Sequence, residues 1–455
     1  MSKFGIVEWS FDFQTIAQRM TTTQILLYLA VMLFHAKLSH VKAFSSTATR
    51  QIYQTKLYSR QNAARKIPRR IGIVGGGLAG LSVAYHLLNE TRQESIQITV
   101  LDKASGPGVG GASAVAGGLV HPLSPRGKIV LGGEEALDVT SNLIAVASRH
   151  SNQVVLRHLL YRLALSDTHV KQLIHTANNY PHFATWKSQR EILEIMQQSG
   201  YCLEDDKEYN TTVLGGLELS NGCQVIHVPT YLQSLWLECQ SCAKNLGDTV
   251  EWDQVAFTDD QHWEELLSDF EAVVYAAGSG LFRPNGGIFQ NVLGDLSLPV
   301  ELVRGQSVEL DMPSNTDATI QSLPEAFLCG KYVTPTPTPN RILIGATHEY
   351  KDKPLSSHEV IQEIRHRTPF IIDSKWETSN IHRVTSGWRV QSNRGAQGRL
   401  PIIGQLPGSN SWIFTGLSSR GLLYHGIYGK LLSQAIFQGT DEFLLQKYPH
   451  LAWWR

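Results

Sequence analysis

The strongest structural signal in this chain is Ile71-Gly72-Ile73-Val74-Gly75-Gly76-Gly77-Leu78-Ala79-Gly80. Its first four residues predict a buried strand, and the glycines that follow have the GxGxxG spacing of a dinucleotide-binding turn. Gly75 permits the tight turn, Gly77 lets a pyrophosphate approach the backbone, and Gly80 allows the next helix to pack closely on the strand. The free N–H groups at the start of that helix, at Leu78 and Ala79, then face the phosphate charge.

A second apolar segment supports this interpretation. Ile98-Thr99-Val100-Leu101 predicts another strand, and it leads into Asp102, 22 residues after Gly80. A carboxylate at this position can accept hydrogen bonds from the ribose hydroxyls of adenosine, and we include the adjacent Lys103 in the same site. The alternative is a purely structural strand-to-helix turn that Asp102 only caps.

The first 70 residues have the composition of a targeting sequence. They contain eleven Lys and Arg but only two acids, and residues 40–70 contain none. The apolar run of residues 25–34 has the length of a signal-peptide core and is too short to span a bilayer. The Ala43-Phe44 pair resembles the junction between signal and transit peptides in algae with secondary plastids. We therefore expect residues 1–66 to be an organelle presequence, for a plastid rather than a mitochondrion, and no transmembrane domain in the mature protein. The alternative is a retained N-terminal anchor or a disordered tail.

The charge of the remaining chain argues against nucleic acid as a partner. The other 29 basic and 38 acidic residues give positions 71–455 a formal charge of −9. Phosphate contacts supply most of the non-specific affinity for nucleic acid, so such binding is not expected. The five cysteines are scattered, with neither a disulfide framework nor two ligand pairs, so no metal site is expected.

The rest of the chain indicates a second domain. Residues 106–119 are almost all small, which lets the backbone lie against a flat ligand. Apolar residues at helical spacing predict helices over 133–200, and residues 215–219 and 224–229 predict a hairpin. Short β-like segments over 299–349 predict a second sheet.

The last part of the chain returns to the first sheet. Residues 334–340 form a proline-rich turn that joins two segments of the predicted second sheet. Residues 412–415 predict a strand that leads into a long helix ending at Gln438. The second sheet is therefore expected to be inserted into the nucleotide-binding domain.

Six motifs follow the first one in an order that resembles the D-amino-acid oxidase superfamily of FAD enzymes. They are GGASxxAGG at 110–118, VELVRGQ at 300–306, IGAT at 344–347, SGWR at 386–389, LPIIG at 400–404 and GLSSRG at 416–421. Within that superfamily the chain is most similar to glycine oxidase, to the oxidase module of the bacterial bifunctional tRNA wobble-uridine-modifying enzyme, and to plant FAD oxidoreductases.

The resemblance implies an α/β fold in which a Rossmann-like FAD-binding domain is interrupted by a substrate domain with a mostly antiparallel sheet. Residues 67–132, 225–285 and 380–440 would form the FAD-binding domain. Residues 133–224 and 286–379 would form the helical substrate domain, and residues 441–455 a C-terminal tail.

The resemblance also implies that FAD contacts several separate segments. The residues that would hold it are Gly75, Gly77, Leu78, Ala79, Gly80, Asp102, Lys103, Gly111, Ala112, Ser113, Val255, Ala277, Gly278, Gly416, Ser418, Ser419, Arg420 and Gly421. The turn at 416–421 would bring a helix start to the N1–C2 edge of the flavin, where it stabilises the negative charge of reduction. An ordinary strand-to-helix cap is the alternative for this turn. Residues 111–120 contain no His or Cys, so FAD is expected to be non-covalent.

The activity that the resemblance implies is oxidation of the C–N bond of a small amine or amino acid. Hydride would pass to the flavin N5, the resulting imine would hydrolyse, and the electron acceptor would be O2 or another, unknown compound. Arg389 would hold the substrate carboxylate in a bidentate fork. Arg394 is a competing candidate, and a surface ion pair is the alternative for either arginine. Tyr332, Tyr424 and His425 are possible pocket groups on pattern alone.

Two other functions stay open from the sequence. One is tRNA modification of the carboxymethylaminomethyl-uridine type, because that substrate also has a secondary amine and a carboxylate. The other is a catalytically idle flavoprotein that acts in complex assembly. Arg399 stands near the position where an acidic residue is usual before Leu400-Pro401, so the identity of the substrate is not fixed by the motifs.

Overall fold

A computed structural model describes residues 69–92, 94–201, 213–256, 265–282, 297–313, 323–368, 371 and 373–455. The chain divides into two units, Met1–Lys66 and Ile67–Arg455, and the fold described here is that of the second. The predicted presequence, residues 1–66, lies outside the described residues. No helix in the described ranges combines the length and the apolar character needed to cross a bilayer.

The first sheet has six strands in the order β16-β17-β10-β1-β2-β9. Their bounds are β1 Arg70–Val74, β2 Gln97–Asp102, β9 Thr249–Gln254, β10 Ala272–Tyr275, β16 Ile402–Gln405 and β17 Ser411–Thr415. All neighbours pair in parallel except β16 with β17. The central strands β1 and β10 are almost wholly buried, as parallel strands covered on both faces are.

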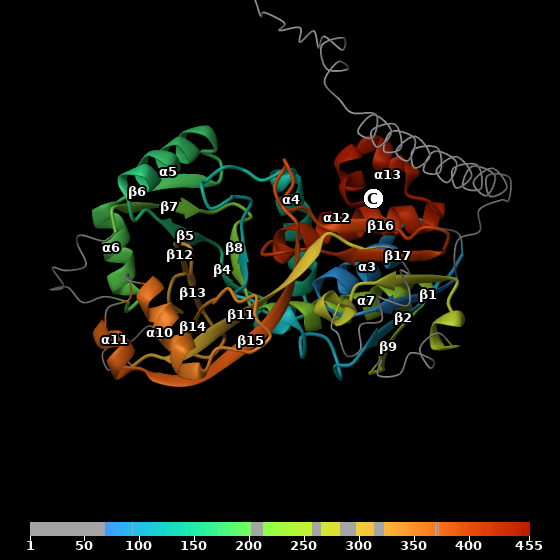
Figure 1. The fold of residues 1–455 in the computed structure, drawn as a ribbon, viewed down its shortest axis with the longest axis horizontal. Coiled ribbons are helices and arrows are strands. Elements are labelled where there is room, and N and C mark those ends of the chain that lie inside the picture. The colour runs from blue at the N-terminus through green and yellow to red at the C-terminus, as the bar shows by residue number, and fades with distance from the viewer. Residues whose placement is uncertain are drawn as a thin grey trace, which may run out of the picture. The chain divides into compact units, whose positions relative to one another are not determined.

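Four helices pack together beside this sheet (Figure 1). They are α3 Leu78–Asn89, α4 Gly133–Ser148, α7 Val228–Leu246 and α12 Gly421–Gln438. Helix α12 contacts both α3 and α4, so the late strand and helix do return to the nucleotide-binding turn. The last fifteen residues form α13 Glu442–Lys447 and the short helix η4 Pro449–Trp454, whose Trp454 is buried and donates to the carbonyl of Ile403.

The second sheet has eight strands in the order β15-β11-β14-β13-β12-β5-β7-β6. Their bounds are β5 Leu160–Leu163, β6 Ala184–Ser188, β7 Gly215–Leu219, β11 Val300–Asp311, β12 Phe327–Leu328, β13 Tyr332–Pro335, β14 Arg341–Gly345 and β15 Asn380–Ser392. Every pair is antiparallel except β12 with β5. Helices α5 Asp167–Asn179, α6 Gln189–Gln198, α10 Ser357–Arg367 and α11 Asp373–Thr378 belong to this half of the unit (Figure 1). The predicted fold class, a parallel sheet domain with a second, mostly antiparallel one, is confirmed.

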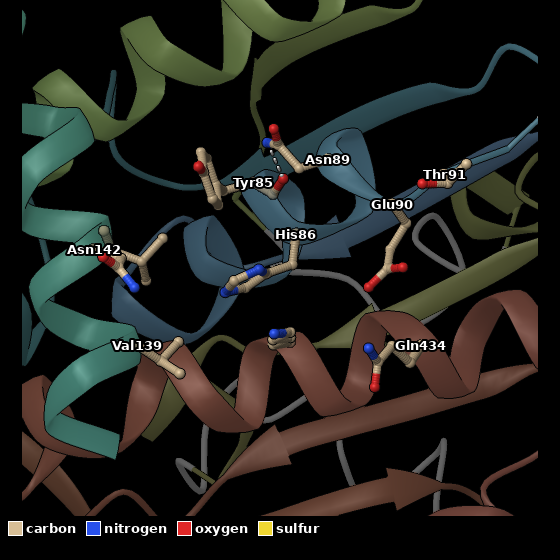
Figure 2. A pocket seen from close by; sticks show the side chains of 10 residues that line it. Tyr85, His86, Asn89, Glu90, Thr91, Val139, Asn142 and Gln434 are labelled. Atoms are coloured by element: carbon tan, nitrogen blue, oxygen red, sulfur yellow. Dashed lines mark hydrogen bonds between the residues drawn. The ribbon is translucent and has the colours of Figure 1, made fainter. Parts of the chain in front are cut away.

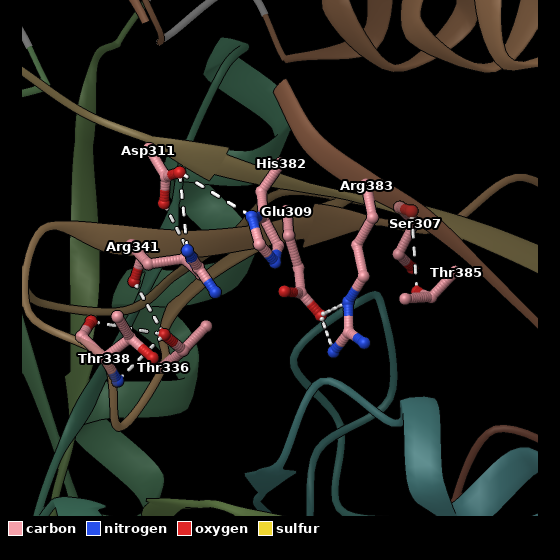
Figure 3. Close-up of polar contacts among 9 residues, drawn as sticks. All are labelled: Ser307, Glu309, Asp311, Thr336, Thr338, Arg341, His382, Arg383 and Thr385. Atoms are coloured by element: carbon pink, nitrogen blue, oxygen red, sulfur yellow. Dashed lines mark hydrogen bonds and ion pairs between the residues drawn. The ribbon is translucent and has the colours of Figure 1, made fainter. Parts of the chain in front are cut away.

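Ion pairs between neighbouring strands hold the outer part of this sheet (Figure 3). Arg341 on β14 pairs with Asp311 on β11 at 2.6 Å, and Arg383 on β15 pairs with Glu309 on β11 at 2.6 Å. Strand β11 is one continuous strand of 12 residues in a region where the sequence predicted short segments, and β15 pairs with it along almost its whole length. The segment 380–392 therefore lies in the second sheet, although the predicted boundary grouped residues 380–440 with the FAD-binding domain.

Two predictions of local structure were wrong. Within residues 133–200, which were predicted as helices, residues 155–163 form β4 Val155–Arg157 and β5, and residues 184–188 form β6. On β5, Leu160 packs in one core, and Tyr161 and Leu163 pack in another, so both faces are apolar and the periodicity resembles that of a helix.

The predicted hairpin does not form because its two strands join different sheets. Strand β7 pairs with β5 and β6, whereas β8 Gln224–Ile226 pairs with β4 and with β3 Leu119–Val120 in a three-stranded sheet.

Candidate functional site

The first glycine turn forms a close-packed backbone cradle. Gly75 has φ +105° and donates to the carbonyl of Leu101 at 2.8 Å. A Cβ on Gly75 would lie 2.5 Å from the backbone nitrogen of Ala277, and one on Gly80 would lie 1.8 Å from the carbonyl oxygen of Gly75. Glycine is therefore required at both positions, and the turn lies directly against the Ala277-Gly278 turn that follows β10. Gly278 also has a positive φ, +54°, and begins the short helix η3 Gly278–Leu281.

The start of α3 is open to an anion. Its N-cap is Gly77, which provides no side-chain cap, and the N–H of Leu78 points to the hydroxyl oxygen of Ser113 at 3.4 Å. Ser113 belongs to the short helix η1 Ala112–Val115, so the small-residue stretch meets the first turn here. Free N–H groups at a helix start and a nearby hydroxyl are suited to a pyrophosphate.

Asp102 organises the loop after β2. Its carboxylate accepts from the N–H of Gly76 at 2.7 Å and from the N–H of Ala104 at 2.8 Å, and its carbonyl accepts from the N–H of Val255 at 2.8 Å. Because a carboxylate has about four acceptor positions, Asp102 retains capacity for ribose hydroxyls. Lys103 is exposed on the same loop.

The late turn at 416–421 lies against the end of β15. Gly416 has φ +70° and Ser418 has φ +56°. The N–H of Ser418 donates to the carbonyl of Val390 at 3.0 Å, next to Arg389 in the chain. Helix α12 begins at Gly421 without a side-chain cap, and Ser419 is exposed. The helix start and the arginine of the SGWR motif thus belong to the same region.

Arg389 extends from the face of the second sheet that meets the small-residue stretch. On the same face of β15, a Cβ on Gly387 would come within 2.6 Å of Val115. The Arg389 guanidinium donates to Nδ1 of His348 at 3.3 Å, and among the described residues it forms no ion pair. Burial lowers the pKa of Arg389, while the nearby Tyr332 and Tyr350 raise it.

Tyr332 lies beside this arginine, and burial raises the pKa of its phenol. Its hydroxyl is 3.0 Å from Oγ of Ser307, and a Cβ on Gly117 would collide with its ring at 2.5 Å. Tyr332 is therefore packed between the second sheet and the small-residue stretch.

The other residues that the sequence offered as pocket groups or carboxylate ligands make different contacts. Tyr424 donates to the carbonyl of Leu131, and His425 is buried against Tyr231, so both serve the packing of helices. Arg394 is exposed, and Arg399 donates to the carbonyl of Ser392 and pairs with Glu301 at 3.4 Å.

His348 and Ser307 were not anticipated from the sequence. His348 directly follows the IGAT motif and Ser307 directly follows the VELVRGQ motif, and this adjacency is the signal by which the sequence could have identified them.

A separate hollow of about 370 Å³ lies between α3, α4 and α12 (Figure 2). Tyr85, His86 and Asn89 line it from the C-terminal half of α3, and Asn142 and Lys430 line it from the other two helices. Tyr85 is seven residues beyond Leu78, so this hollow begins about 10 Å along the helix from the phosphate-facing start.

Comparison with known proteins agrees with this geometry. The model of the family described as FAD dependent oxidoreductase matches residues 70–435. No curated protein sequence matches the chain significantly.

Solved structures share the fold. Glycine oxidase from Geobacillus kaustophilus is 20% identical, with a TM-score of 0.59 over 82% of this chain and 95% of that one. Glycine oxidase from Bacillus cereus is 18% identical, with a TM-score of 0.61 over 83% and 97%. Iminodiacetate oxidase from Chelativorans is 18% identical, with a TM-score of 0.58 over 83% and 98%.

The glycine cradle, the uncapped start of α3 and Asp102 all suit FAD, and the family match extends over most of the chain. The chain therefore belongs to the family of FAD dependent oxidoreductases.

Proposed function

We propose that this flavoprotein oxidises the C–N bond of a small amine or amino acid that carries a carboxylate. The observation that carries the proposal is Arg389, a partly buried cation without a carboxylate partner among the described residues, beside the turn at 416–421. Solved proteins with this fold include glycine oxidase, iminodiacetate oxidase, L-proline dehydrogenase and fructosyl peptide oxidase, and the compounds in these four names all contain an amine, whereas that of L-α-glycerophosphate oxidase does not.

The residues of the site bind and orient the substrate. Arg389 donates two parallel hydrogen bonds to the substrate carboxylate, and the Tyr332 hydroxyl donates a third while Ser307 holds that hydroxyl. His348 accepts from Arg389 and so limits the rotation of the guanidinium. Bound FAD supplies the acceptor for the hydride that leaves the substrate α-carbon.

The amine must be neutral when its α-hydrogen leaves as hydride. The small residues of η1 and the packed Tyr332 ring restrict water around the reacting carbon, and restricted solvation favours the uncharged amine. The uncapped start of α12 presents N–H groups that favour negative charge. The product is an imine, which takes up water and releases ammonia or an amine together with a carbonyl compound.

The test is anaerobic bleaching of the purified flavoprotein with glycine, sarcosine, D-amino acids, L-proline and carboxymethylaminomethyl-uridine. Bleaching by a carboxylated amine, and none by the same amine as its methyl ester, is the expected result. Bleaching by the modified nucleoside alone would instead favour RNA modification. No bleaching by any compound, with FAD bound, would contradict the proposal and favour an assembly role.

We further propose that FAD is bound without a covalent bond and that residues 1–66 direct import into a plastid. The first proposal rests on the absence of His and Cys from residues 111–120, and the second on the basic, acid-poor leading segment. Acid precipitation should leave a colourless pellet, and a fluorescent protein fused behind residues 1–66 should collect in plastids. A yellow pellet or a mitochondrial signal would contradict the respective proposal.

A further inference from the structure

Arg162 is a buried cation that the structure leaves without an anion. Its residue exposure is 7%, its Nη1 donates to the carbonyl of Pro125 at 3.2 Å, and its Nε has no hydrogen-bond partner. Among the described residues it forms no ion pair. The ionisable groups that act on it are Arg420, another cation, and Cys329, whose thiol stays neutral because burial raises its pKa to about 12. An unpaired buried charge is costly, so an anionic ligand is the missing partner.

The register of the second sheet places Arg162 on the same face as Tyr332. Arg162 on β5 is paired with Leu328 on β12, and Leu328 is paired with Tyr332 on β13. Residues paired across neighbouring strands point to the same side of a sheet. The same row continues through Gly345 to Ser307, which contacts Tyr332. The backbones at Arg162 and Tyr332 are therefore about 10 Å apart, two strand spacings.

Two further donors lie near Arg162. Burial is the main cause that lowers the pKa of His121 to about 3, and the positive charges of Arg162 and Arg420 contribute to the same shift. The ring is therefore neutral. Its Nδ1 accepts from the N–H of Leu123 at 3.2 Å, which leaves the ring proton on Nε2. No described acceptor bonds that Nε2. Arg420, the residue before α12, likewise has no described side-chain partner.

We propose that Arg162, with Arg420 and His121, binds a second anionic group of the substrate. This inference rests on the proposed function, because Arg389 and Tyr332 hold the first carboxylate. The preferred substrate class is then an amine with two anionic groups, one on the carbon next to the amine and one several bonds away. Two guanidinium groups and a neutral N–H donor match a carboxylate or a phosphate.

The test uses the oxidised holoenzyme and ligands that cannot be oxidised at an amine. (Methylthio)acetate carries one carboxylate, whereas S-carboxymethyl thioalkanoates with two to five methylene groups carry two. Binding is followed by the change in the flavin absorbance spectrum. The best dianion of the series should bind at least 30-fold more tightly than the monoanion. Equal affinity for the monoanion and every dianion would overturn the proposal.

Variants separate the two anion sites. Arg162→Met should abolish the preference for the dianion and change the affinity for the monoanion less than twofold, whereas Arg162→Lys should keep part of the preference. Arg383→Met is the matched control, because this arginine of the same sheet already has Glu309 as its partner. The assignment of Arg162 to the second anion site would be contradicted if Arg162→Met kept the preference for the dianion. It would also be contradicted if the variant, with the flavin still bound, lost equal affinity for the dianion and the monoanion. The wild-type comparison decides the question by itself if Arg162→Met does not fold.

The readout also separates this inference from the proposed reaction. Binding of thioethers requires no turnover, so the preference for two anions can appear even if no amine is oxidised. Conversely, bleaching by monocarboxylated amines without any preference for dianions would contradict only the second anion site.

Discussion

The guanidinium of Arg389 donates through Nη2 to Nδ1 of His348 at 3.3 Å, across 41 residues of sequence. Arginine has no acceptor, so His348 must present an unprotonated Nδ1. Burial and the charge of Arg389 both lower the pKa of His348 from 6.5, and the imidazole therefore stays neutral at pH 7. This contact fixes the arginine at the position where the late turn and the second sheet meet.

Replacing His348 by Phe should weaken substrate binding more than catalysis. The lost hydrogen bond is worth about 1 kcal/mol, so KM for a carboxylated amine should rise about fivefold with kcat nearly unchanged. In the wild type, KM should also rise as the pH falls through the lowered pKa of His348, because protonation removes the acceptor. In the His348→Phe variant, KM should not rise in this way at acidic pH. An unchanged pH profile of KM in the variant would exclude His348 as a positioning residue.

Arg389→Ala should cost about 3 kcal/mol in transition-state binding, or roughly 100-fold in kcat/KM for a carboxylated amine. Arg389→Lys should recover part of this loss, because it keeps the charge but not the fork. Arg394→Ala is the control, since Arg394 is exposed and should change kcat/KM less than twofold. The role of Arg389 would be refuted if Arg389→Ala lowered kcat/KM no more than Arg394→Ala does.

Gly80→Ala should reduce the affinity for FAD. The new Cβ would lie 1.8 Å from the carbonyl oxygen of Gly75, which is backbone and cannot move without opening the cradle. Overpacking of this kind costs about 1–3 kcal/mol, so the Kd for FAD should rise about 5- to 150-fold in fluorescence titration of the apoprotein. Gly106→Ala is the control, because nothing lies within 4 Å of its Cβ position. Equal Kd values for the two variants would contradict the close-packed turn.

Local backbone requirements made part of this structure predictable. Gly75 needs a positive φ, and Gly80 needs room for the carbonyl of Gly75 five residues earlier, so the spacing of these glycines predicts the strand, the turn and α3 from local sequence alone. The same holds for the turn between β13 and β14, where proline and Asn340 with φ +57° reverse the chain.

Long-range pairing was not predictable in the same way. Leu160 and Leu163 face different cores, and no local pattern shows that the strands near residues 215 and 224 separate into two sheets. His348 meets Arg389, and Arg162 shares a face with Tyr332, only because β5, β12, β13, β11 and β15 assemble into one sheet. The motifs therefore identify the cofactor side of the site, and the substrate side depends on tertiary register.

The stability of the protein should fall at mildly acidic pH, and His425 should account for part of that loss. His425 is fully buried in α12, where Nδ1–H donates to the carbonyls of Gly421 and Leu422, and Nε2 accepts from the hydroxyl of Tyr231 at 2.7 Å. Burial lowers its pKa from 6.5 to about 4, so between these values the unfolded chain binds a proton that the folded chain refuses. Stability is therefore intact above pH 6.5 and decreases as the pH falls towards 4. From pH 7.5 to 5.0 the protonation of this one group should lower the free energy of unfolding by about 2 kcal/mol.

His425→Gln removes this titration, so the urea midpoints at the two pH values should differ less in the variant than in the wild type. His86 and His121, whose pKa values are lowered to about 3, keep a residual slope in both proteins. An identical pH dependence of the two midpoints would show that His425 is not buried as a neutral ring.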